Sequence, residues 1–324
     1  MRYDDTHGFV SLDGAELRGG ALDTGQALSP VAPAPLGRGS EADREAWRQG
    51  LAALPDVARE RATKAVARLA APERVVEMHT VSARGPHHLF FAFPGGSGRA
   101  AVLGVTSGAY SVALRTGGDL AASLQGALGL DAAFTGSDLV RPLDAHAALA
   151  LAAFLDVLRA NRLLAELRHE RPLESAAARD VAARLADSRT ADPRWPLCAL
   201  EKVLPFDVTA IAGETAVSAS LGRLVAAGLL QAAEATGALP ALFSPGPDLE
   251  PLVEECSRAV AHVALSTFRP AADGSLAYES ALLLRGPVSL WLLSLAPEGG
   301  GIASLSPAGA SRLVARLSGV PSRL

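Results

Sequence analysis

The chain has 324 residues, of which 49% are hydrophobic and 20% charged, and this composition excludes a wholly disordered or a fibrous protein. Thirty basic residues against thirty-four acidic ones leave a net charge of −4, which argues against a general nucleic-acid binder. The length suits two or three packed units better than one core.

Cysteine content and apolar runs indicate the compartment. Cys198 and Cys256 are too few for a disulfide framework or a closed zinc site. The N-terminal residues lack the apolar stretch of a secretory signal, and the longest apolar run, 147–155, is too short to cross a bilayer. We therefore expect a cytoplasmic protein with no membrane segment. Abundant Ala, with Lys64 and Lys202 as the only lysines, indicates a bacterial source with a GC-rich genome.

Residues 1–40 show little periodicity and are rich in Gly and Pro, most of all at 29–35. This pattern is typical of an extended or polyproline-like segment that lies over the body of the protein. Val10 and Leu12 alternate with polar neighbours and indicate at most a short edge strand.

Residues 41–135 are expected to form an α+β half. Ser40 and Asp43 match a capping box, and Pro55 divides the helical pattern that follows. Short strand-like runs separated by Gly-rich breaks predict an antiparallel meander at 75–83, 88–93, 100–105 and 110–114. Thr116 then caps a further helix.

Residues 246–324 repeat this order of a helix, four strands and a helix. Asp248 opens the first helix, and Ser306 followed by Pro307 opens the last. The expected strands lie at 259–268, 276–284, 288–295 and 302–305. We interpret the repeat as a degenerate internal duplication whose two sheets would pair across a pseudo-two-fold axis. The alternative is chance, since α+β proteins often share such an order.

Between the halves, residues 136–190 are predicted to be a helical connector, and residues 191–245 a separate module. The module shows three helical segments, the third starting at Thr215, followed by short strand-like runs at 231–233 and 241–243. This order resembles a winged helix-turn-helix over about 194–244. The resemblance implies a third helix that reads bases in the DNA-binding members of that family.

The third helix of the module is poorly suited to DNA. It starts with small neutral side chains, Arg223 is its only basic residue, and the module has a net charge of −2. Since DNA binding relies on several basic contacts to phosphates, the composition favours packing or protein contact. In the alternative of a transcription regulator, the DNA contacts would come from Ser218, Ser220 and Arg223.

No motif for catalysis, cofactor binding or metal binding is evident. The glycine-rich stretch at 96–101 is followed by a strand pattern, whereas a dinucleotide loop needs a helix there. No nucleophile elbow and no paired His or Cys ligands occur. The sequence thus favours a non-enzymatic protein without cofactors or metals. In the alternative of an enzyme of unrecognised type, the candidate residues are His79, His262 and Glu255.

The most apolar part of the chain is the strand pair around Trp291. Leu284, Leu290, Trp291 and Leu292 place apolar side chains on both faces of the predicted hairpin, and both faces of such strands are usually covered. One face can pack on local helices, while the other needs the rest of the chain, a sister subunit or a partner. These four residues are our predicted partner-binding site.

The sequence therefore predicts an α+β protein with two sheet-and-helix halves around a helical middle. This plan of antiparallel sheets backed by helices in related halves loosely resembles the type VII secretion (EspG) chaperones. The resemblance implies a cytosolic chaperone that binds a secreted substrate without catalysis. From the residues, we expect an adaptor or chaperone that binds another protein, or a second copy of itself, through a sheet edge or the apolar hairpin.

Overall fold

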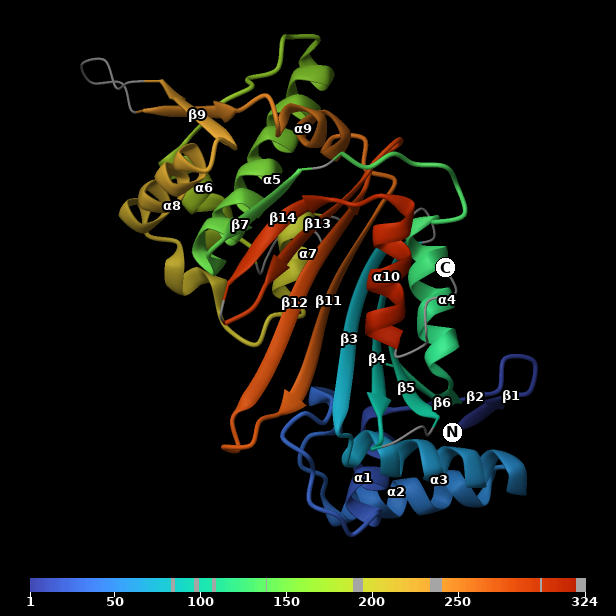
Figure 1. The fold of residues 1–324 in the computed structure, drawn as a ribbon. Helices are drawn as coiled ribbons and strands as arrows, with labels where there is room; N and C mark the ends of the chain where they lie inside the picture. Colours follow the sequence, from blue (N-terminus) through green and yellow to red (C-terminus); the bar gives the residue numbers. More distant parts are fainter. Residues whose placement is uncertain are drawn as a thin grey trace.

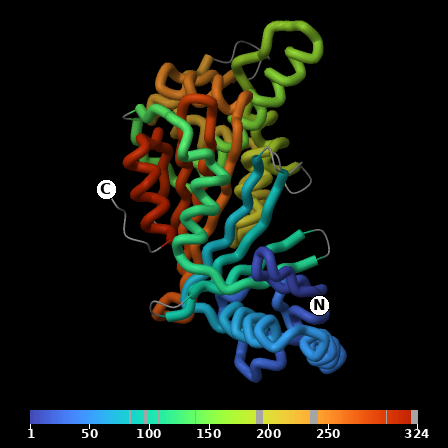
Figure 2. Tube along the Cα trace, turned by 90° about the vertical axis from the view of Figure 1, so that its right-hand side faces the viewer, coloured from blue at the N-terminus to red at the C-terminus, as the bar shows by residue number. Residues whose placement is uncertain are grey.

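The computed structural model describes residues 1–82, 85–95, 99–106, 109–137, 139–188, 195–233, 241–297 and 299–318. In these residues the chain is a mixed α+β fold, as the sequence predicts, with an 11-stranded sheet and helices on both of its faces (Figures 1 and 2). A separate sheet has three strands.

The strands of the large sheet are β1 (Arg2–Asp4), β2 (Phe9–Leu12), β3 (Arg74–Ser82), β4 (Gly85–Phe93), β5 (Ala100–Thr106), β6 (Ala109–Arg115), β7 (Val140–Leu143), β11 (Ala261–Pro270), β12 (Leu276–Arg285), β13 (Leu290–Leu295) and β14 (Gly300–Ser304). The small sheet consists of β8 (Ala176–Ala177), β9 (Leu230–Ala233) and β10 (Leu242–Pro245). The helices are α1 (Gly14–Asp23), α2 (Glu41–Ala52), α3 (Asp56–Ala70), α4 (Gly117–Leu128), α5 (Ala145–Arg168), α6 (Ala178–Ala186), α7 (Pro196–Glu201), α8 (Glu214–Ala226), α9 (Glu250–Cys256) and α10 (Pro307–Ser318), with short 3-10 turns η1 (Ala34–Leu36) and η2 (Val208–Ile211).

The two predicted meanders form one continuous sheet. Its strand order is β1-β2-β6-β5-β4-β3-β11-β12-β13-β14-β7. Strands β3 and β11 pair antiparallel at the centre, with Met78 opposite Leu265. The first strand of each predicted meander therefore lies at this seam, and the later strands of each meander extend outward from it.

Helix starts agree with several of the capping signals in the sequence, but the prediction that Asp248 opens a helix is wrong. Helix α9 starts at Glu250 after Leu249, without a side-chain cap, and the Asp248 carboxylate instead lies 2.8 Å from the Arg141 guanidinium. Ser40 and Asp43 form a reciprocal capping box at α2, and Thr116 forms one with Asp119 at α4. Pro55 separates α2 from α3, and the Ser306 hydroxyl accepts a hydrogen bond from the backbone of Gly309 at α10. These local hydrogen bonds satisfy backbone donors that a helix start otherwise leaves free.

The N-terminal 40 residues differ from the predicted extended segment. Strands β1 and β2 extend the large sheet beyond β6, and α1 begins at a capping box made by Asp13 and Glu16. Three glycines in α1 weaken its helical signal in the sequence. Two of them, Gly19 and Gly20, instead let the helix lie directly on α2 at Asp43 and Trp47.

The large sheet has a front face and a back face, defined by the helices that cover them. Helices α4 and α10 lie on the front face, toward the viewer in Figure 1. Helices α1 to α3 cover the back face over the β1–β6 end, and α5 with its neighbours covers it over the β11–β14 end (Figure 2). Alternate residues of each strand face the core clusters on the two sides of the sheet, as the pleat requires.

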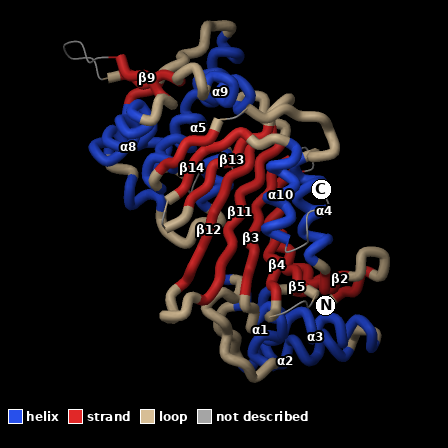
Figure 3. The backbone as a smooth tube through the Cα atoms, in the orientation of Figure 1, coloured by secondary structure: helices blue, strands red, loops and turns tan. Residues whose placement is uncertain are grey.

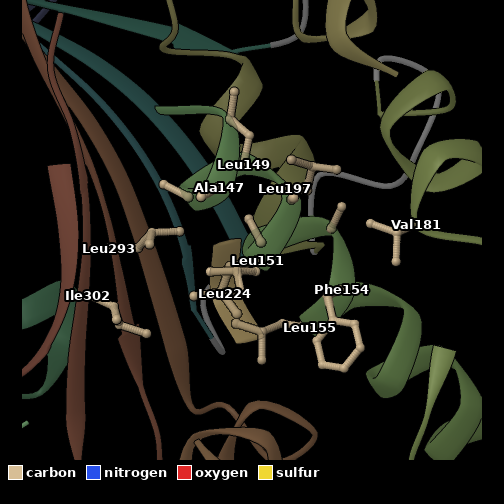
Figure 4. Packing of buried hydrophobic residues seen from close by; sticks show 14 of the residues in the cluster. Ala147, Leu149, Leu151, Phe154, Leu155, Val181, Leu197, Leu224, Leu293 and Ile302 are labelled. Atoms are coloured by element: carbon tan, nitrogen blue, oxygen red, sulfur yellow. The ribbon is translucent and has the colours of Figure 1, made fainter. Parts of the chain in front are cut away.

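Helix α5 forms the centre of the largest core. Its residues 147–155 are all buried, because the sheet lies on one side and α6, α7 and α8 pack around the others. Figure 4 shows Leu151 and Phe154 of this helix among Leu197, Leu224 and Leu293, which come from α7, α8 and β13. The apolar run that is too short to span a membrane is therefore an internal core helix.

The connector and the middle module share the small sheet. Its order is β8-β10-β9, and β8 comes from the predicted connector, whereas β9 and β10 are the strands predicted in the module. Residues 191–194 and 234–240 of the module lie outside the described residues. Strand β7, also in the predicted connector, pairs with β14 at the edge of the large sheet.

Candidate functional site

The front face of the large sheet is left uncovered near the β7 edge. Figures 1 and 3 show α4 and α10 over the central strands and no described helix in front of β13, β14 and β7. The ladder pairs Leu292 with Ala303, and Ala303 with Val140, so these three residues form one row across the face. Val140 is 65% exposed, and Leu292 and Ala303 are partly exposed. We call these three residues, with Pro142, the front apolar strip.

A cavity of about 340 Å³ adjoins this strip where α10 crosses the sheet. The sheet contributes Leu265, Ala281 and Leu292, and α10 contributes Leu313 and Leu317. At one end, the guanidinium of Arg316 lies 3.7 Å from the Glu279 carboxylate. The strip and the cavity together form an apolar surface with a charged border, which is a common pattern in protein interfaces.

The structure places the four residues of the predicted apolar hairpin differently from one another. Leu284 and Trp291 lie on the back face in the core around α5, and Leu290 lies on the front face in the core under α10. All three are buried by this chain alone, and the Trp291 indole donates to the Ser289 hydroxyl at 2.6 Å. Leu292 is the one member of the four that reaches the surface, as part of the front apolar strip.

The cause of this difference is the coverage of the two faces. Strand alternation puts residues 290 and 292 on one face and 291 on the other, as the sequence indicates. What the sequence lacks is the position of α10, which covers Leu290 and ends its coverage near Leu292. The exposed neighbours Val140 and Pro142 carry no strand signal strong enough to connect them with a hairpin 150 residues away.

The two edges of the large sheet are short. Strand β1 has three residues, and β7 has four, among them Pro142. A proline has no backbone N–H to donate, so it weakens β7 as a template for an added strand. The sequence predicts binding through a sheet edge or through the apolar hairpin. The short edges are poor templates, and of the four hairpin residues only Leu292 lies at the surface, in the front apolar strip.

Helix α8 carries the residues of the DNA-binding alternative. Ser218 is exposed, whereas Ser220 is buried and donates to the backbone carbonyl of Ala216 at 2.9 Å. Arg223 Nε lies 2.7 Å from the Asp144 carboxylate, and its Nη2 donates to Ser220. The basic side chain of this helix is thus already paired with an acid, so that a phosphate would have to compete with Asp144 for it.

The histidines of the enzyme alternative lie near the seam on the back face. His79 and His262 are buried on the neighbouring strands β3 and β11, while Glu255 on α9 accepts hydrogen bonds from Ser289. Burial, followed by the charges of His88, Lys202 and His262, lowers the pKa of His79 to about 4. This histidine is therefore neutral at pH 7.

Beside His79, the ring of His88 lies 2.7 Å from the Glu77 carboxylate. Within the described residues, no group of three or more His, Cys, Asp or Glu side chains is arranged to hold a metal ion. In the same part of the chain, no helix has the length and hydropathy needed to cross a bilayer.

Comparisons with known proteins find similarity to solved structures and not to protein families. No protein-family model matches the chain, and no curated protein matches it. Among solved structures, the chain is similar to the Mycobacterium tuberculosis type VII secretion system chaperone EspG5, solved in complex with a PE25–PPE41 dimer. The TM-score is 0.45 at 12% sequence identity, and the alignment covers 96% of this chain and 95% of that chain.

Proposed function

We propose that this protein is a non-enzymatic adaptor or chaperone that binds another protein across the front apolar strip. The observation that supports this most directly is the exposure of Val140 and Pro142 next to the partly exposed Leu292 and Ala303. Four adjoining apolar residues on an open sheet face are an unfavourable surface in water unless something covers them.

The cavity beside α10 supports the same proposal. An apolar side chain of a partner would enter the space between Leu292 and Leu313, with Arg316 and Glu279 at its border. Burial of an anchoring side chain in such a space supplies much of the binding free energy in protein complexes. A second copy of this chain is an alternative occupant, which the oligomeric state in solution distinguishes.

We propose further that the chain arose by internal duplication and acts in the cytoplasm. The antiparallel pairing of β3 with β11 and the matching order of elements on either side support the duplication.

We also propose that the middle is a winged-helix-like packing module, supported by the β8-β10-β9 order and by Leu221 and Leu224 of α8 in the core around α5.

The proposed interface is tested with an exposed valine on the strip and a matched valine elsewhere. Val140→Asp places a charge in the strip, and Val57→Asp places one on α3, where Val57 is 59% exposed. Neither side chain is buried, so both variants should keep the far-ultraviolet circular dichroism of the parent. In a pull-down from the native cell, we expect the parent and Val57→Asp to capture the same partner proteins. Val140→Asp should fail to capture them. Equal capture by both variants would contradict an interface at the strip.

A second measurement addresses the DNA-binding alternative. A gel-shift titration at low salt with the full-length protein should show no binding, since Arg223 is paired and the module is acidic. A salt-sensitive shift would instead favour a regulator.

A further inference from the structure

The back face holds a second cavity, of about 380 Å³, between the N-terminal segment and the turn after α7. Its floor includes Val75, Phe90 and Phe268 from three neighbouring strands of the sheet. One wall is the proline-rich segment 30–34, and the other is formed by Lys202, Leu204 and Pro205. The cavity is thus lined mainly by apolar side chains from parts of the chain far apart in sequence.

The proline-rich wall is fixed in place by hydrogen bonds. The backbone N–H of Ser29 donates to the carbonyl of Ala70, and its hydroxyl donates to the carbonyl of Pro72. Val31 and Leu36 are buried in the N-terminal core. These contacts hold segment 30–34 against the end of α3, so that it forms a fixed wall of the cavity.

Two charged side chains, Glu77 and Lys202, line the cavity. The Glu77 carboxylate is mostly buried and already lies 2.7 Å from the His88 ring. The Lys202 side chain is exposed, and no hydrogen bond or ion pair joins its ammonium to another of the described residues. The neighbouring His79 is buried, and its Nδ1 has no hydrogen-bond partner within the described part of the chain.

We infer that this cavity binds a small amphiphile with an apolar body and an anionic head group such as a carboxylate. The apolar body would lie on Phe90 and Phe268, and the head group would pair with the Lys202 ammonium. The anionic choice follows from the charges: the Glu77 carboxylate already has His88 as a partner, whereas none of the described residues pairs with the Lys202 ammonium. The site lies on the opposite face of the sheet from the front apolar strip, so the inference is independent of the proposed function.

The probes are decanoate and decylammonium, which share a chain length and differ in the sign of the head group. Isothermal titration calorimetry on the full-length protein, below the concentrations at which the probes aggregate, should show one decanoate site and weaker binding of decylammonium. Lys202→Glu should weaken decanoate binding about tenfold, because it replaces an attraction by a repulsion. Lys64→Glu, which changes the other lysine of the chain on the exposed surface of α3, should leave binding unchanged.

A variant that changes volume and not charge completes the test. Leu276 lies at the cavity and is exposed, so Leu276→Trp should fill the space and abolish binding without unfolding the protein. Leu173→Trp, at an exposed leucine elsewhere, serves as its control. The inference is overturned if decanoate does not bind the parent, if decylammonium binds as tightly, or if Lys202→Glu and Leu276→Trp bind decanoate like their controls.

Discussion

The contact between α1 and α2 gives a sharp test of the packing. A Cβ added to Gly19 would lie 1.9 Å from the carbonyl oxygen of Asp43 and 2.8 Å from the backbone nitrogen of Arg44. Both atoms belong to the backbone of α2, so no side-chain rotation can relieve the clash. The helices would have to separate by roughly 1.5 Å to restore ordinary van der Waals contact, which would also loosen the contact of Gly20 with Trp47.

We therefore expect Gly19→Ala to lower the free energy of unfolding. Alanine in a helix gains about 1 kcal/mol over glycine, whereas overpacking a tight contact costs about 1–3 kcal/mol, and a backbone contact belongs at the upper end of that range. The net expectation is a loss of about 1–2 kcal/mol. Gly222→Ala is the matched control, because Gly222 lies in the exposed surface of α8 with nothing within 4 Å of an added Cβ.

The assay is urea unfolding, followed by circular dichroism and by tryptophan fluorescence. Trp47, which contacts Gly20 between the two helices, contributes to the fluorescence signal. Gly222→Ala should raise the free energy of unfolding by about 0.5–1 kcal/mol, as for an exposed helical site. If Gly19→Ala were as stabilising as Gly222→Ala, the described contact between the two helices would be wrong.

Three further predictions concern single side chains. Asp156 is fully buried beside Arg184, and burial raises the pKa of Asp156 from 3.8 to about 6, so the folded state binds this proton more tightly than the unfolded state does. The free energy of unfolding should therefore fall by on the order of 3 kcal/mol as the pH rises from 4 to above 6. In urea titrations at several pH values, Asp156→Asn should flatten this part of the profile, and an unchanged profile would count against the raised pKa of Asp156. Ser40→Ala removes the capping box of α2 and should cost about 1 kcal/mol in the same assay, whereas no loss would show that the cap contributes nothing. Trp291→Asp puts a charge into the core and should unfold the protein by circular dichroism, while Leu292→Glu should remain folded, and the reverse result would contradict the described orientation of β13.

Local signals in the sequence predict the elements of the two halves well. Gly-rich breaks and alternating apolar residues are short-range features, so the eight strands from β3 to β6 and from β11 to β14 lie within a few residues of their predicted ranges. Capping by Ser40 and Thr116 is equally local. The α+β class follows from these elements.

Contacts between elements that lie far apart in the sequence could not be predicted from local patterns. Helix α1 depends on glycines that make sense only once α2 lies beside it, and β7 depends on β14 for its hydrogen bonds. The candidate interface is similar: Leu292 is predictable as an apolar surface residue, but its neighbour Val140 becomes visible only when the strands are placed side by side.

The central pairing of β3 with β11 also affects how the protein is made. Residues 81 and 262 must meet before the middle of the sheet is complete, so the native contacts have a large separation along the chain, which is associated with slow folding. During synthesis, the first half carries an open β3 edge until Ala261–Pro270 has left the ribosome. The period between synthesis of the first half and synthesis of β11 is therefore the stage at which this protein is most exposed to strand mispairing and aggregation.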